Sequence, residues 1–192
     1  MRLFVALEVG TEVRDCLTGL IEELRAVDAA AAKNRARWVR VDNLHMTLKF
    51  IGNVNGGRLD AIREALSEVR PRNVVEMRFR GLGFFPNDRR PRVLWAGVQA
   101  APDLSPLADE IDARLGQIGI PRETRKFAPH LTLARFDPSG ISGELRTATK
   151  QFTSRDFGVV RTGKFHLFES KTRPTGAEYT RLSSFAFAEG KA

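Results

Sequence analysis

Two of the three histidines in this sequence share one local pattern, a histidine followed two residues later by a threonine. His45 precedes Thr47 in the first copy, and His130 precedes Thr132 in the second. The flanking residues favour strands, in which side chains at positions i and i+2 point to the same face. Each imidazole therefore has a hydroxyl about 6–7 Å along its strand, while the apolar residues between them point into a core.

A cleft that brings the two pairs together would suit displacement at phosphorus. One imidazole can remove a proton from the nucleophile while the other protonates the leaving oxygen, since both titrate near neutral pH. The two hydroxyls can hold the non-bridging oxygens. Arg135, three residues after Thr132, can add a charge-assisted contact to the phosphate.

Other uses of the histidines fit the sequence less well. A single histidine in a strand usually has a structural role, but two matching copies argue against that interpretation. Zinc normally takes three or four ligands from His, Cys, Asp and Glu. No carboxylate or cysteine accompanies either copy at ligand spacing, so we expect no metal and no cofactor. His166 has no threonine two residues on, and we predict a structural role for it.

The elements that must position these pairs occur twice in the same order. Strand-like segments begin at residues 2 and 92, and apolar helical stripes begin near 11 and 103. The two His-Thr strands and the strands that follow them repeat at a similar offset. A fixed offset of this kind indicates internal duplication. We therefore predict a repeated βαβαβ unit, with Thr11 as the cap of the first helix.

This order predicts an α+β fold. We expect duplicated βαβαβ-type lobes with antiparallel sheets around a central cleft and helices on the outside. Residues 1–192 should form one bilobal domain, with the first half covering about 1–90 and the second about 91–192. The pair Gly81 and Gly83 lacks the third glycine of a dinucleotide site, so we predict a bend in a strand there.

Charge and composition limit the compartment and the kinds of partner that we expect for this chain. The chain has 192 residues, a formal net charge of +8 and one cysteine, Cys16, which excludes an internal disulfide and fits a reducing cytoplasm. No apolar run is long enough to span a membrane. The 24 arginines outnumber the 7 lysines, which reflects either a GC-rich genome or contact with phosphates. Basic residues that precede both His-Thr strands predict a positive rim for the cleft: Arg35, Arg37, Arg40, Arg122, Arg125 and Lys126.

The two motifs and their surroundings resemble the two-histidine (2H) phosphoesterases, and within them the bacterial RNA 2′,3′-cyclic phosphodiesterases, also called 2′-5′ RNA ligases. The resemblance covers nearly the whole chain. It includes the opening strand at residues 1–7, the blocks at 37–52 and 127–135, the middle at 81–95, and a C-terminal hairpin at 167–180. Either motif alone would be weak support, but the pair is specific.

The resemblance implies metal-free hydrolysis of RNA 2′,3′-cyclic phosphate ends to 2′-phosphates, with reversible 2′-5′ ligation as a further activity. It implies that His45 is the proton donor and His130 the acceptor, with Thr47 and Thr132 holding the phosphate. The expected partner is RNA with cyclic phosphate ends, tRNA-derived RNA included. We expect a cytoplasmic monomer with no membrane or protein partner. The alternatives are a 2H enzyme for a small cyclic nucleotide or an ADP-ribose cyclic phosphate, and a non-catalytic RNA-binding module.

Overall fold

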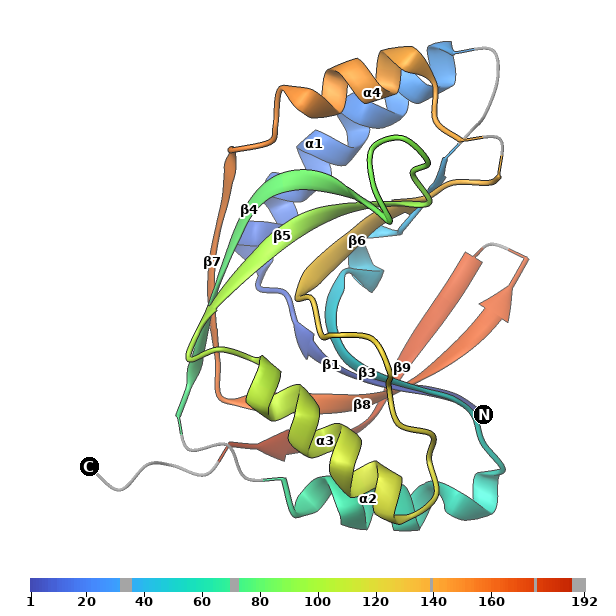
Figure 1. Cartoon of the computed structure of the whole chain (residues 1–192), viewed down its shortest axis with the longest axis vertical. Coiled ribbons are helices and arrows are strands. Elements are labelled where there is room, and N and C mark those ends of the chain that lie inside the picture. The colour runs from blue at the N-terminus through green and yellow to red at the C-terminus, as the bar shows by residue number, and fades with distance from the viewer. Residues whose placement is uncertain (32–35, 70–72, 139, 175, 188–192) are drawn as a thin grey trace.

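The computed structural model describes the chain except for residues 32–35, 70–72, 139, 175 and 188–192. The described part holds a curled antiparallel sheet and four α-helices (Figure 1). The first half of the chain contains β1 (Arg2–Glu8), α1 (Thr11–Ala30), β2 (Arg37–Trp38), β3 (His45–Asn53), α2 (Leu59–Ser67) and β4 (Val75–Phe85). The second half contains β5 (Val93–Ala101), α3 (Ser105–Gln117), β6 (His130–Arg135), α4 (Gly143–Lys150), β7 (Asp156–Thr162), β8 (Lys164–Arg173) and β9 (Gly176–Ala186).

This order confirms the predicted α+β class and the repeat of strand, helix, strand, helix, strand. Two local predictions were wrong. The sequence of residues 37–41 predicts a strand before His45, but only Arg37–Trp38 form one, because the chain turns into a 3-10 helix at Val41–Asn43. Thr11 does not cap α1 but is its first residue, and Gly10 occupies the cap position without a side-chain hydrogen bond.

The sheet interleaves the two halves, which differs from the expectation of one lobe per half. Its strand order is β7-β4-β5-β6-β3-β1-β8-β9, with β2 beside β6. Thus β4 lies between two strands of the second half, and β8 pairs with β1. Consecutive strands joined by a short connection usually pair in antiparallel fashion. The predicted boundary near residue 90 falls inside the short connection between β4 and β5, so these two strands pair across it.

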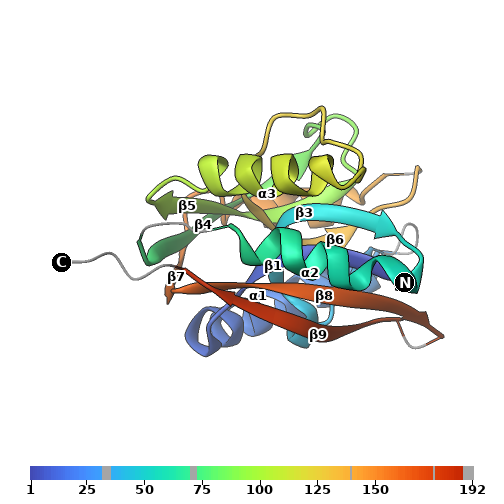
Figure 2. The same ribbon diagram turned by 90° about the horizontal axis from the view of Figure 1, so that it is seen from below.

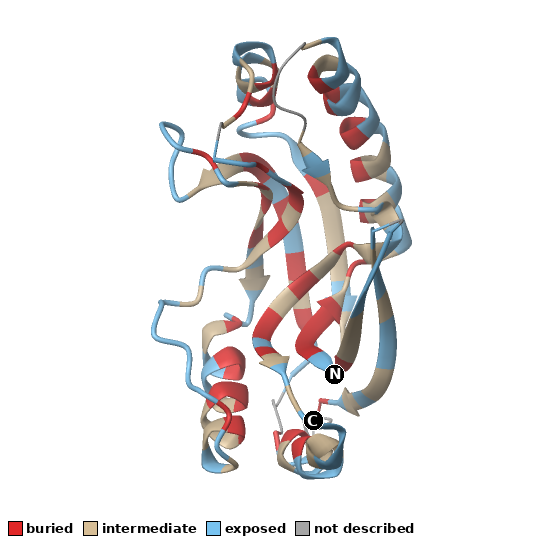
Figure 3. Cartoon of the chain, turned by 90° about the vertical axis from the view of Figure 1, so that its right-hand side faces the viewer, coloured by how far each residue is buried: buried red, intermediate tan, exposed pale blue. Residues whose placement is uncertain are grey.

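The helices cover the outside of the curled sheet in two pairs. α1 packs against α4, and α2 packs against α3, so the pairs lie at opposite ends of the molecule in Figure 1. Seen from below, β8 and β9 form one side and α3 lies on the other (Figure 2). The buried residues lie along the strands and on the inner faces of the helices (Figure 3). On α1 they are Val13, Leu17, Leu20, Ile21, Leu24 and Asp28.

The two glycines of β4 shape the strand, as predicted. Gly81 has φ +71°, a backbone conformation that residues with a side chain rarely adopt. It lies where the register between β4 and β5 shifts. A Cβ on Gly83 would overlap the indole of Trp95, so only glycine lets that ring lie flat on β4. Trp95 lies on the strand beside the second His-Thr strand, because it pairs with Thr132.

Candidate active site

The two His-Thr strands have the same pattern of burial. Along both β3 and β6 the first six residues run half-buried, buried, half-buried, buried, buried, exposed. The two consecutive buried residues mark a β-bulge in each strand: Val5 and Ala6 of β1 pair with Lys49 and Thr47, which leaves Leu48 as the extra residue. Leu133 is the extra residue in β6, because Leu94 and Trp95 of β5 pair with Ala134 and Thr132.

The bulges decide which side chains share the face of the histidines. In a regular strand, residues three apart point to opposite faces. One extra residue reverses that alternation, so Phe50 returns to the face of Thr47 and Arg135 returns to the face of Thr132. Each strand therefore has three side chains on the face of its histidine: His45, Thr47 and Phe50 on β3, and His130, Thr132 and Arg135 on β6.

The strands meet at one pair, Met46 opposite Leu131, and both residues are fully buried. The antiparallel register then sets His45 opposite Thr132 and Thr47 opposite His130. Side chains opposite each other lie about 4.5–5.5 Å apart at their Cβ atoms. Each imidazole thus has the hydroxyl of the other motif across from it. The structure brings together all five residues that the sequence singled out.

Both imidazoles are held in the same tautomer. Nδ1 of His45 donates to the carbonyl oxygen of Asn43 at 2.7 Å, and Nδ1 of His130 donates to that of Ala128 at 2.7 Å. A carbonyl oxygen only accepts, so the proton lies on Nδ1 and leaves Nε2 to act as base or, once protonated, as acid. Asn43 is itself fixed, because its Nδ2 donates to the carbonyl oxygen of Ala177 at 2.6 Å.

Aromatic rings orient His45. Its ring centre lies 4.6 Å from that of Phe4 on β1 and 5.1 Å from that of Tyr179 on β9, the latter edge-on. Tyr179 falls within the predicted C-terminal hairpin, but the sequence predicts no role for it. Its only local signal is that it is the single tyrosine of the chain. Burial raises the pKa of Tyr179, so its hydroxyl stays protonated.

His130 has a different aromatic support. Phe85 meets its ring edge-on with the centres 4.8 Å apart, and Trp95 lies 5.2 Å behind Phe85. The indole rests on Gly83, as described above. The C-terminal end of β4 therefore supports the second imidazole through Phe85, with Trp95 behind that ring, whereas the C-terminal hairpin supports the first.

Burial lowers the pKa of both imidazoles below the usual 6.5. The pKa of His45 falls to about 4, because burial outweighs the hydrogen bond to Asn43, and the charges of Arg135 and His130 lower it further. Burial also lowers the pKa of His130, with a smaller contribution from Arg135. The expectation of titration near neutral pH is therefore corrected: without a ligand both rings are neutral at pH 7.

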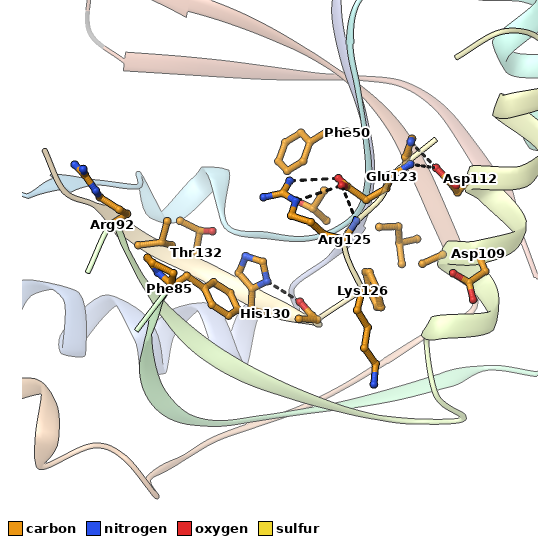
Figure 4. A pocket seen from close by; sticks show the side chains of 18 of the residues that line it. Phe50, Phe85, Arg92, Asp109, Asp112, Glu123, Arg125, Lys126, His130 and Thr132 are labelled. Carbon is orange, nitrogen blue, oxygen red and sulfur yellow. Dashed lines mark hydrogen bonds and ion pairs between the residues drawn. The ribbon is translucent and has the colours of Figure 1, made fainter. Parts of the chain in front are cut away.

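A cavity of about 670 Å³ opens on this face (Figure 4). Its lining includes Thr47, Phe50, His130, Thr132 and Arg135 but not His45, and it continues past the loop before β6 toward α3. From the predicted rim, Arg125 and Lys126 line it, and Arg92 joins them. Three other rim candidates do not line it: Arg37 pairs with Asp137, Arg40 with Asp42 and Arg122 with Asp112. Arg35 lies outside the described residues.

A buried ion pair fixes the loop that leads to His130. The ammonium of Lys49, on the core side of β3, binds the carboxylate of Asp112 on α3 and donates to the carbonyl oxygen of Pro121 at 2.7 Å. The same carboxylate accepts from Nε of Arg122 at 2.9 Å and from the backbone N–H of Glu123 at 3.0 Å. The first motif strand thereby anchors the loop before the second.

His166 lies away from the cleft pair. It is buried on β8, its Nδ1 lies 2.8 Å from Oγ of Ser184, and its Nε2 lies 3.5 Å from a carboxylate oxygen of Glu8. Within the described ranges, no three His, Cys, Asp or Glu side chains cluster as metal ligands would. Nor does the described part contain a helix long and apolar enough to cross a membrane.

A curled antiparallel sheet that sets two His-Thr pairs against each other defines a two-histidine phosphoesterase. The family model of the LigT-like phosphoesterases matches residues 12–95 and again residues 97–179, and this chain belongs to that family. The double match supports the internal repeat inferred from the sequence.

Individual relatives agree over almost the full length. An Archaeoglobus fulgidus protein named RNA 2′,3′-cyclic phosphodiesterase is 34% identical over 96% of this chain and 99% of its own. A Thermotoga maritima protein of the same name is 31% identical over 99% and 97%. A crystal structure of a Thermus thermophilus protein covers 98% of this chain and 99% of its own, with a TM-score of 0.76 and 28% identity. E. coli LigT complexed with 3′-AMP shares the fold, with a TM-score of 0.77 at 24% identity and 98% coverage of both chains.

Proposed function

We propose that this chain is a metal-independent RNA 2′,3′-cyclic phosphodiesterase that produces 2′-phosphate ends. The observation that carries the proposal is the pair of half-buried imidazoles that share one tautomer on two strands that meet at Met46 and Leu131. Among the described residues, Nε2 of neither ring makes a hydrogen bond, and the register sets each histidine opposite the threonine of the other motif. The names of the relatives support the substrate class.

In the proposed step, the cyclic phosphate lies between the two rings. Nε2 of His130 takes a proton from water as the water oxygen bonds to phosphorus, and protonated Nε2 of His45 gives its proton to O3′ as the P–O3′ bond breaks. The product carries a phosphomonoester on O2′. His130 then returns its proton to solvent and His45 regains one. A 5′-hydroxyl in place of water would give a 2′-5′ linkage by the same transfers, which accounts for reversible ligation.

The remaining site residues bind the phosphate in this proposal. Thr47 and Thr132 donate hydrogen bonds to its non-bridging oxygens, and Arg135 neutralises the charge that develops there. The guanidinium of Arg135 lowers the pKa of both histidines in the free protein. A bound phosphate opposes that effect, because its negative charge favours the protonated imidazole. Substrate binding thus raises the pKa of His45, so that Nε2 takes up a proton from solvent before the chemical step.

RNA with cyclic phosphate ends, tRNA-derived RNA included, is the proposed partner. The cavity extends past the phosphate site and carries Arg92 and Lys126 on its wall, as a polyanion would require. We propose a cytoplasmic monomer that works without a cofactor.

The test is to hydrolyse a cyclic-phosphate oligonucleotide, a nucleoside 2′,3′-cyclic phosphate and an ADP-ribose cyclic phosphate, and to identify each product by phosphorus NMR. We expect the oligonucleotide to be the best substrate and its product to be the 2′-phosphate, with EDTA leaving the rate unchanged. A 3′-phosphate product would refute the proposed roles. Preference for either small substrate would favour the small-molecule alternative, and binding without turnover the RNA-binding module.

A further inference from the structure

The connection between β4 and β5 carries a cluster of arginines. Residues 87–92, the basic loop, contain three exposed arginines and one acid: Arg89, Arg90, Arg92 and Asp88. A fourth arginine, Arg146 on α4, donates through Nη1 to the carbonyl oxygen of Asp88. Four guanidinium groups thus accompany a single carboxylate on this part of the surface.

The arginines of the basic loop differ from many others in having no carboxylate partner. Among the described residues, ten arginines pair with a carboxylate at 3.8 Å or less. Within the same residues, none of the three loop arginines forms an ion pair. The basic loop therefore keeps a positive charge that no neighbouring side chain balances, and such a charge attracts an anion.

Hydrogen bonds hold the backbone of the basic loop in place. Oδ1 of Asn87 accepts from the backbone N–H groups of Arg89 and Arg90 at 3.0 and 3.1 Å. The backbone N–H of Arg92 donates to the carbonyl oxygen of Phe85 at 2.7 Å. Because the loop is already ordered, binding an anion costs little backbone entropy.

The basic loop lies at the end of the cleft that contains His45. Arg92 lines the cavity, and its carbonyl oxygen accepts at 2.9 Å from the backbone N–H of Phe136, directly after the end of β6. The antiparallel register sets His45 opposite Thr132, which is nearer to that end of β6 than His130 is. In Figure 4, Arg92 lies beyond Thr132 as seen from His130.

The connectivity of RNA directs its chain to the same end. The proposed function places O3′ at His45 and the attacking water at His130. The preceding phosphodiester is attached through O5′ and C5′ to C4′, which adjoins C3′ and not C2′. The chain therefore leaves the terminal ribose on the side of O3′, toward the basic loop.

We propose that the basic loop and Arg146 form a phosphate subsite that binds the phosphodiester preceding the 3′-terminal nucleotide. This inference rests on the proposed function, because it uses the position of O3′. The two non-bridging oxygens of a phosphodiester share one negative charge, and a guanidinium can donate to both of them. The phosphate subsite distinguishes the end of an RNA chain from a mononucleotide and reads no base.

The test compares two dinucleotides that end in a 2′,3′-cyclic phosphate. One has a phosphodiester between its nucleosides, and the other has an uncharged methylphosphonate there. For the wild type, kcat/KM should be roughly three- to tenfold higher for the phosphodiester, because the arginines are exposed and their contacts are screened by solvent. This ratio should fall as salt is added.

The double variant Arg89→Ala/Arg90→Ala should bring the ratio close to one. Arg89→Lys/Arg90→Lys should keep most of it, because the charges remain. The matched control is Arg25→Ala. Arg25 is exposed and forms no ion pair with a described residue, but it lies on α1 outside the cavity. The control should leave the rates on both dinucleotides unchanged.

Two results would overturn the phosphate subsite and leave the proposed function standing. One is an equal kcat/KM of the wild type for the two dinucleotides, and the other is an equal loss on both in Arg89→Ala/Arg90→Ala. Hydrolysis of neither dinucleotide by the wild type would overturn the proposed function, and the phosphate subsite with it.

Discussion

The two motif strands have the same geometry but different surroundings. Each sets a histidine, a threonine and a third residue on the cleft face through a bulge at the same position, and each fixes its imidazole by a 2.7 Å hydrogen bond to a carbonyl oxygen two residues earlier. They differ in the third residue, Phe50 against Arg135, and in the rings that support the imidazole. Duplication therefore supplies the matched pair of proton carriers, and the residues around them make the roles unequal.

The largest expected effect comes from removing either imidazole. His45→Ala and His130→Ala should each lower kcat by roughly 10²–10⁴, because each removes one of the two proton transfers. The double variant should lose less than the product of the single losses, since the pair acts as a unit. Steady-state kinetics on a cyclic-phosphate oligonucleotide checks this. Near wild-type turnover in either single variant would remove that residue from the mechanism.

The next largest effect should come from Arg135, which shares the face of His130 and Thr132 on β6. Arg135→Ala should lower kcat/KM by on the order of ten- to hundredfold, because it removes a charge-assisted contact to the phosphate. Arg135→Lys should recover part of the loss, since it keeps the charge without the guanidinium fork. In Arg135→Ala the pKa of each histidine should rise, because the charge of Arg135 lowers it. NMR titration of the imidazoles checks this, and unchanged histidine pKa values would contradict the placement of Arg135 beside both rings.

The pH profile should show the effect of burial. The free enzyme must hold a proton on His45 and none on His130. Because the pKa of His45 is about 4 and that of His130 is also below 6.5, kcat/KM should rise as the pH falls below 6.5. The value of kcat/KM should be highest at a pH between these two pKa values and should decline as the pH falls further. The profile of kcat should peak at higher pH, because bound phosphate raises both pKa values. A kcat/KM maximum above pH 7 would contradict this interpretation.

The smallest effect is that of salt. Arg92 and Lys126 line the cavity near the two ends of β6, and each phosphate they neutralise releases a counterion. The Kd of a catalytically inactive variant for RNA should therefore rise with salt more steeply for a longer oligonucleotide than for a dinucleotide. Lys126→Ala should reduce the slope for the longer RNA only. A slope that does not depend on length would confine recognition to the terminal nucleotide.

Much of this arrangement could be predicted from the sequence. The spacing of His45 and Thr47 sets their common face, and the repetition of that spacing at His130 predicts a symmetric site, since strand alternation is a local rule. The bulges are not local in this sense: they depend on pairing with β1 and β5, so nothing in the sequence around Phe50 shows which way it faces. The support of His45 by Tyr179 needs a contact between residues more than a hundred positions apart.

The neutral state of the imidazoles could not be predicted from the sequence either, because it depends on burial by Phe4, Phe85 and the C-terminal hairpin of β8 and β9. The interleaving of β4 and β8 was missed for a related reason. Periodicity identifies each strand and the repeat identifies equivalent strands, but neither states which strands pair. The short connection between Phe85 and Val93 was the available signal for the pairing of β4 with β5.

The central claim is that two imidazoles of equal geometry have unequal roles, and a substrate with sulfur in place of O3′ tests it most directly. A thiolate leaves without a proton, so it needs no acid but still needs a base to activate water. His45→Ala should therefore regain most of the wild-type rate on the sulfur substrate, while His130→Ala stays slow. Recovery of His130→Ala, or equal recovery of both variants, would contradict the assignment of His45 as the donor and His130 as the acceptor.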